Sequence, residues 1–148
     1  LYQQEQMVLL QLHIIVVEHQ DNMNTSSLDK EAWLKSRKYI LEALDRGIDT
    51  HSERDVYDAI VKGNAQLWTG QKSACVTEVV TYPKYKALRF WLGGGNLEEL
   101  KKMEKPICDW AKSIGCKKSM IMGRKGWSRL KDKDRAYEEV GTISIRSL

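Results

Sequence analysis

The sequence contains few of the residues that mark specialised classes of protein. Its 148 residues include only two prolines, one phenylalanine and three cysteines. Cys75, Cys108 and Cys116 are odd in number and lack the C-x-x-C spacing of a zinc site or a redox dithiol. We therefore expect reduced, mostly buried thiols and a cytoplasmic compartment. The three histidines form no metal-binding or Ser-His-Asp pattern, so we predict no metal site.

No apolar run of a length that crosses a bilayer is present. The apolar stretch 7–17 has 11 residues and is interrupted by Gln11 and His13, whereas a spanning helix needs about 20. It also lacks the basic flank and the small-residue cleavage site of a secretory signal. We expect no membrane partner. Residues 1–22 are either a first buried strand or a leader, because "MNTSSLDKEAW" from Met23 reads like a natural start.

The two common nucleotide-binding patterns, G-x-G-x-x-G and the P-loop, are also absent. Charge is nevertheless distributed unevenly along the chain. Residues 1–83 carry 8 basic and 12 acidic side chains, and residues 84–148 carry 16 basic and 8 acidic ones. The C-terminal half is therefore where we expect an anionic ligand, either a phosphorylated cofactor or a nucleic acid. A solvated basic face without a partner is the alternative.

The periodicity of the apolar residues, together with the capping and turn residues between the periodic segments, predicts a single α/β (α+β) domain over residues 23–148. Helical spacing of apolar residues predicts a helix over 28–48 and a shorter one over 50–63, which begins at a Thr50–Glu53 capping box and ends at Gly63. Three runs rich in β-branched and aromatic residues follow and predict an antiparallel meander, over 64–70, 73–83 and 86–94.

A long helix is predicted next, from Asn96 to a C-cap at Gly115, with a bend at Pro106. The chain then alternates as a strand over 117–122, a short helix at "GWSRL" and a last strand over 138–148. The predicted order is α-α-β-β-β-α-β-α-β, with residues 1–22 as a candidate extra N-terminal strand. The sheet is expected to be mixed, mostly antiparallel and flanked by helices.

The junction "WLGGGNLEEL" is the most unusual stretch of the sequence. A strand that ends in glycines and leads into a helix can present free backbone N–H groups and the positive end of a helix dipole to an anion. Leu92, Gly93, Gly94, Gly95 and Asn96 are therefore candidate cofactor-binding residues. The alternative is that the glycines only form a tight corner, as many strand-to-helix connections do.

The order of elements resembles the GNAT acyltransferase fold. The segments "THSERDVYDAIVKGNAQLW", "SACVTEVVTYPKYKALRFWLGGGNLEEL", "CDWAKSIGC" and "GRKGWSRL" are similar to a family of small GNAT-like proteins encoded mainly by tailed bacteriophages, over roughly Trp33 to Ile145. The resemblance implies acyl-CoA bound with its pyrophosphate at the start of the central helix. The chain departs from active members, because the connection "WLGGGNLEEL" is shorter and has no Arg or Gln ahead of its glycines.

The resemblance also directs attention to catalytic candidates. Glu78, between apolar neighbours in "CVTEVV", is the candidate base, and the alternative is a carboxylate on the solvated face of a strand. Tyr137 matches a "Y-x-x-x-G" pattern around the acid tyrosine of some GNAT enzymes. Arg124 and Lys125 are candidates for the adenosine phosphate of the cofactor or for a nucleic-acid backbone.

Two functions follow as expectations. The first is a phage-encoded N-acetyltransferase that binds acetyl-CoA and transfers the acetyl group to an amine substrate. The second is a noncatalytic GNAT-fold protein that contacts other proteins of the phage virion or its assembly. The expected location is the host cytoplasm, or the virion in the second case. Nucleic acid is not expected as a partner, although salt-sensitive binding through the basic half is a third alternative.

Overall fold

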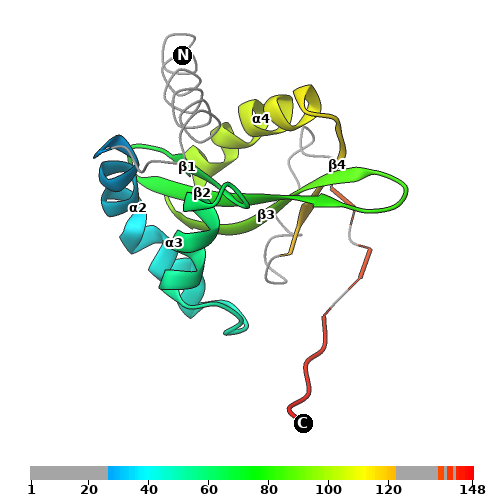
Figure 1. Ribbon diagram of the computed structural model, residues 1–148, viewed down its shortest axis with the longest axis horizontal. Helices are drawn as coiled ribbons and strands as arrows, with labels where there is room; N and C mark the ends of the chain where they lie inside the picture. The colour runs from blue at the N-terminus through cyan, green and yellow to red at the C-terminus, as the bar shows by residue number, and fades with distance from the viewer. Residues whose placement is uncertain (1–26, 123–136, 139, 142) are drawn as a thin grey trace.

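A computed structural model of the chain describes residues 27–122, 137–138, 140–141 and 143–148. Seven elements are present in these residues (Figure 1). The helices and strands are, in chain order, α2 (Ser27–Asp45), α3 (Glu53–Val61), β1 (Gln66–Thr69), β2 (Ser73–Thr81), β3 (Lys86–Gly95), α4 (Leu97–Ser113) and β4 (Cys116–Ile121). This order confirms the predicted α-α-β-β-β-α-β sequence of elements up to Ile121.

The four strands form one mixed sheet in the order β1-β2-β3-β4. The pairs β1–β2 and β2–β3 are antiparallel, and β3–β4 is parallel because α4 carries the chain back across the sheet. In Figure 1, α4 lies on one side of the sheet, and α2 with α3 lies on the other. The prediction of a mixed, mostly antiparallel sheet flanked by helices in one domain is confirmed.

Each helical layer buries its own cluster of apolar side chains against the sheet. The α4 side contains Trp68, Cys75, Leu88, Met103, Ile107, Ala111 and Cys116. The α2–α3 side contains Trp33, Ile40, Val56, Ile60, Ala65, Leu67 and Val76. The buried indole of Trp68 donates a 2.8 Å hydrogen bond to Thr77 Oγ1, so its polar group is satisfied inside the core.

A β-bulge interrupts the pairing of β2 with β3. Val76 lies opposite Leu92 and Thr77 opposite Phe90, so Trp91 is an extra residue on β3. Trp91 and Leu92 consequently both pack against the α2–α3 core cluster, whereas strict alternation would place them on opposite faces.

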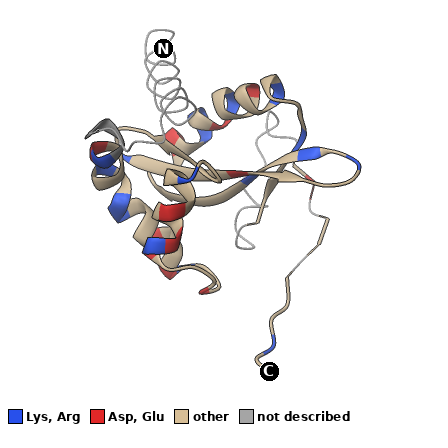
Figure 2. Ribbon diagram, viewed as in Figure 1, with Lys and Arg blue, Asp and Glu red and all other residues tan. Residues whose placement is uncertain are grey.

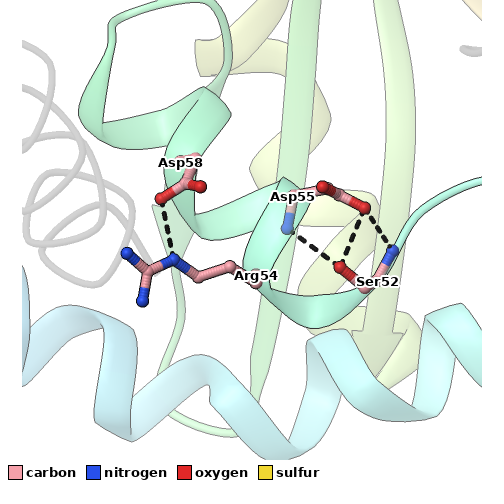
Figure 3. A network of polar contacts seen from close by, with 4 residues as sticks. All are labelled: Ser52, Arg54, Asp55 and Asp58. Atoms are coloured by element: carbon pink, nitrogen blue, oxygen red, sulfur yellow. Dashed lines mark hydrogen bonds and ion pairs between the residues drawn. The ribbon is translucent and has the colours of Figure 1, made fainter.

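Helix α3 begins at a capping box that differs from the predicted one (Figure 3). Ser52 is the N-cap: its hydroxyl accepts from the Asp55 amide at 3.2 Å, and its own amide donates to the Asp55 carboxylate at 2.8 Å. Arg54 also pairs with Asp58 one turn later. The predicted Thr50–Glu53 box was therefore wrong by two residues. The Thr50 hydroxyl instead lies within hydrogen-bond distance of His51 Nδ1, at 2.7 Å.

The end of the chain also differs from the prediction. The described residues of 138–148 form no strand, and Val140, Ile143 and Ile145 are exposed. In Figure 1 the C-terminal segment leads away from the sheet. The predicted last strand is therefore not formed there. The predictions on residues 1–22 and on the short helix at "GWSRL" lie outside the described residues, and none of the described helices is long and apolar enough to cross a membrane.

Candidate functional site

The three glycines of the junction belong to β3 and to its ladder with β2. Gly93, Gly94 and Gly95 lie opposite Cys75, Ala74 and Ser73. The strand therefore continues through the glycines, and only Asn96 separates it from α4. A loop that could wrap around a pyrophosphate is not formed, because the backbone is engaged in the ladder up to Gly95.

Two of these glycines are required by close packing. A Cβ on Gly94 would lie 2.3 Å from the carbonyl oxygen of Tyr39, so the backbone of α2 rests directly on this glycine. Gly95 has φ +101°, and a Cβ there would lie 2.3 Å from the carbonyl oxygen of Lys72. Gly93 differs, since its nearest neighbour would be Leu100 Cδ1 at 4.0 Å. Leu92, the remaining candidate on this strand, packs half-buried against the α2–α3 core cluster.

The first turn of α4 is closed by acceptors from the chain itself. Asn96 is the N-cap, as the sequence predicted, and its Oδ1 accepts from the Glu99 amide at 3.0 Å. The amide of Asn96 donates to the carbonyl of Lys72 at 3.0 Å. Within the described residues, the amides of Leu97 and Glu98 are the first-turn donors left without a protein acceptor.

Glu99 joins this helix terminus to the turn between β1 and β2. Its Oε1 accepts from the Lys72 amide at 2.9 Å and from the Ser73 hydroxyl. Gly70 makes room for it, because a Cβ at that position would lie 2.0 Å from the same oxygen. The turn itself is closed by the Gly70 amide, which donates to the Ser73 carbonyl at 2.9 Å. A carboxylate of the protein thus fills the space in front of the corner.

The electrostatics at this terminus disfavour a second anion. Glu98 and Glu99 both lie in the first turn of α4, where their charges complement the helix dipole. An arriving pyrophosphate would meet two like charges at the position where the dipole alone would attract it. The junction is therefore a tight corner held by hydrogen bonds, and the described residues around it do not fit the pyrophosphate of acetyl-CoA.

Glu78, the candidate base, forms an ion pair. It lies directly opposite Arg89 on β3, and Arg89 Nη2 contacts its carboxylate. The two side chains are 23% and 25% exposed, so the pair is partly screened from water. The Nε of Arg89 is buried without a hydrogen-bond partner among the described residues. Trp91, two residues further along β3, stacks edge-on with His51 at a ring-centroid separation of 4.7 Å.

Tyr137, the candidate acid, lies against β4. Its hydroxyl is 2.8 Å from Ser119 Oγ. Burial raises the pKa of this phenol above its ordinary value, and the Glu104 carboxylate adds to the increase, whereas the hydrogen bond with Ser119 opposes it. The phenol is consequently protonated across the physiological range. Burial likewise raises the pKa of the Cys75 thiol to about 12.

The sheet separates the two catalytic candidates. Ser119 pairs with Leu88, whose side chain is in the core cluster on the α4 side, so Tyr137 approaches from that side. Glu78 lies between Thr77 and Val79 on β2, and Val79 packs on the α4 side, so Glu78 faces the opposite side. Gly94 lies six residues beyond Leu88 along β3, a distance of about 20 Å. The structure therefore does not bring Glu78, Tyr137 and the glycine corner together.

Sequence reasoning missed the residues that close the corner. Tyr39, Lys72, Ser73 and Glu99 act through contacts between segments far apart in the chain. The local pattern marks Gly70 only as a break between strands, and Glu99 only as a partner of the helix dipole. The basic candidates Arg124 and Lys125 lie outside the described residues. The residues that the structure describes contain no cluster of three or more potential metal ligands.

Comparison with known proteins shows a shared fold only. The sequence matches no family model and no curated protein. The structure is similar to the crystal structure of a point mutant of TTHA1254 from Thermus thermophilus, with a TM-score of 0.52 and 13% identity over 72% of this chain and 92% of that one. The wild-type TTHA1254 structure aligns over the same shares with a TM-score of 0.48 and 16% identity.

Proposed function

We propose that this chain is a noncatalytic protein of GNAT fold that acts through surface contacts in the particle of a tailed phage or in its assembly. The assignment to phage rests on the resemblance of its motifs to the phage family. The assignment as noncatalytic rests on the contacts of the described residues. It favours the second of the two functions expected from the sequence.

The closed terminus of α4 is the observation that carries the proposal. An acyl-CoA enzyme of this fold needs backbone donors at the start of the central helix for the pyrophosphate. Here the Asn96 amide is bonded to Lys72, the Glu99 amide is bonded to the Asn96 side chain, and the glycines before them are paired with β2. Opening the site would break several hydrogen bonds, each at a cost of about 1 kcal/mol, and would expose the buried Ser73 hydroxyl.

The candidate acid and base give independent support. A general base must be within hydrogen-bond reach of the proton that it removes, and the acid must reach the leaving group of the same substrate. Glu78 is held by Arg89 on one side of the sheet, and Tyr137 is held by Ser119 on the other. This arrangement is better suited to packing than to proton transfer at one reacting centre.

The test combines binding with turnover. Isothermal titration calorimetry with acetyl-CoA and with desulpho-CoA, up to millimolar concentration, is expected to give no binding heat. Thiol release from acetyl-CoA in the presence of a panel of amines is expected to equal the rate without protein. Micromolar binding of acetyl-CoA together with amine-dependent thiol release would overturn the proposal.

Acyl-CoA binding remains the second candidate because of one feature of β3. The strand pairs with β4 only from Lys86 to Phe90, so Trp91–Gly95 present an edge with no β4 partner among the described residues. An unpaired strand edge offers backbone donors and acceptors to an extended ligand, and a bulge such as that at Trp91 commonly accompanies a functional site. If acetyl-CoA bound in calorimetry while the contacts at the α4 terminus stayed unchanged, the edge at Trp91–Gly95 would be the favoured site.

A further inference from the structure

An unassigned surface lies at the opposite end of β3 from the glycine corner. It consists of the turn between β2 and β3, the C-terminal end of α4 and the start of β4. The parallel pairing of Lys86 with Cys116 brings these three segments together. We call it the basic end, and its lysines are Lys84, Lys86, Lys112, Lys117 and Lys118.

The basic end has no compensating acidic side chains in its own segments. Residues 79–88 and 110–122 contain these five lysines and no Asp or Glu, and Asp109, just before the second range, pairs with Lys105 at 2.7 Å. Lys84, Lys112, Lys117 and Lys118 are exposed, and they make no ion pair with any residue that the structure describes. Close positive charges without counter-charges repel one another, which favours the binding of an anion across them.

Two local features hold the lysines in place. Lys86 Nζ donates to the carbonyl of Ile114 at 2.7 Å, which ties the hairpin to the end of α4. A bulge on β4 then inserts Lys117, because Lys86 lies opposite Cys116 but Ala87 lies opposite Lys118. Bulges redirect side chains at a sheet edge, and here two consecutive lysines are exposed beside the hairpin.

The same hairpin carries exposed aromatic surface. Tyr82 is 42% exposed and packs edge-on against Tyr85, with ring centroids 5.8 Å apart. The turn is closed by the Tyr82 amide, which donates to the Tyr85 carbonyl at 2.9 Å. Figure 1 shows the hairpin projecting from the body of the protein, and Figure 2 shows basic and no acidic colour at its outer end.

From this arrangement we propose that the basic end binds single-stranded nucleic acid, with phosphates on the lysines and a base stacked on Tyr82. Lysines act as point charges for phosphate without reading sequence, and an exposed ring accepts any base. A duplex would meet the lysines but would keep its bases inside the stack. An acidic protein segment would likewise use the lysines, yet it would gain nothing specific from an aromatic ring at the tip. This proposal takes up the third alternative drawn from the sequence, nucleic-acid binding through the basic half, in place of the expectation that nucleic acid is not a partner.

The test is fluorescence anisotropy of the full chain with a labelled oligo-dT and with a duplex of the same length. We expect a dissociation constant in the micromolar range for the single strand. Four to five phosphate contacts predict a slope of about −3 for log affinity against log salt, or roughly sixty-fold weaker binding at 200 mM than at 50 mM salt. The double variant Lys117→Gln/Lys118→Gln should reduce this slope by about 1.4.

A matched double variant, Lys30→Gln/Lys35→Gln, removes the same charge from exposed positions of α2 and should leave the slope unchanged. Tyr82→Ala should weaken single-strand binding about fivefold or more, and Tyr82→Phe should retain it. Equal losses in the two lysine variants would overturn the proposal. Equal affinity for the duplex and the single strand would also overturn it. Displacement of the strand by polyglutamate, together with no effect of Tyr82→Ala, would overturn it as well, because it would indicate a general polyanion surface.

Discussion

Gly94→Ala is the substitution that best separates a tight corner from an anion cradle. The new Cβ would lie 2.3 Å from the Tyr39 carbonyl oxygen, 3.0 Å from its carbon and 3.2 Å from its Cα. All three are backbone atoms of α2, so no side-chain rotation relieves the clash. Either α2 or β3 must move, and α2 contributes Trp33 and Ile40 to its core cluster.

The expected destabilisation follows from this geometry. Overpacking a well-packed site costs about 1–3 kcal/mol, and a clash with backbone should fall near the upper limit. With a urea dependence of about 1.5 kcal/mol per molar, the unfolding midpoint should fall by about 2 M. Urea unfolding followed by tryptophan fluorescence measures this shift, since Trp33 and Trp68 are buried.

Gly93→Ala is the matched control for this experiment. The site is on the same strand, and the nearest heavy atom to its new Cβ would be Leu100 Cδ1 at 4.0 Å, which is ordinary contact. Its stability should lie within about 0.5 kcal/mol of the parent protein. If both variants unfolded at the parent midpoint, the packing role of Gly94 would be refuted. If Gly94→Ala were stable but lost an acetyl-CoA binding signal, the cradle interpretation would replace it.

Three further predictions test other parts of the structure. Glu99→Gln should lower the free energy of unfolding in urea by about 1–3 kcal/mol, because its hydrogen bonds to the β1–β2 turn weaken. The control Glu98→Gln should change stability by less than about 0.5 kcal/mol. Equal effects of the two substitutions would contradict the role of Glu99. Ser52→Ala should lower stability by about 1 kcal/mol and Thr50→Ala by less, and the reverse order would restore the capping box predicted from the sequence. Burial raises the pKa of Cys75 to about 12, so above the unfolded pKa near 9 the thiol of the unfolded chain loses its proton first and the free energy of unfolding falls as the pH rises. Cys75→Ala should make this fall between pH 9 and 11 shallower by up to about 1.4 kcal/mol per pH unit. An unchanged slope would show that Cys75 does not contribute to it.

The elements that could be predicted from sequence are those with local signals. The three-strand meander could be predicted because its runs of β-branched residues alternate and stop at turn residues. Helix α4 could be predicted because Asn96 caps its start and Gly115, at φ +95°, follows its end. The α3 cap was ambiguous in the sequence. Both Thr50–Glu53 and Ser52–Asp55 have the required spacing, and only the backbone path distinguishes them.

The contacts that decide the role of the glycine corner depend on tertiary arrangement. Gly94 is needed because α2 crosses the sheet with Tyr39 above it, and no local pattern records that crossing. The partner of Glu78 is set by strand register, which the bulge at Trp91 shifts by one residue. The alternation of the last segment predicted a strand, but a strand also needs a neighbouring edge at the right distance, which the sequence does not supply.

The central claim is that the chain's own groups occupy the start of α4: the Asn96 amide is bonded to Lys72, the Glu99 amide to Asn96 Oδ1, and the Glu99 carboxylate to the β1–β2 turn. A ¹⁵N–¹H correlation NMR titration with acetyl-CoA follows the amides of Asn96, Leu97, Glu98 and Glu99 directly, including the two that have no protein acceptor among the described residues. We predict that millimolar acetyl-CoA shifts these four resonances no more than a change in ionic strength does. Free ADP and sodium phosphate should therefore produce the same small shifts. Saturable shifts concentrated at the four amides, with micromolar affinity and dependence on the acetyl-CoA pyrophosphate, would contradict the claim.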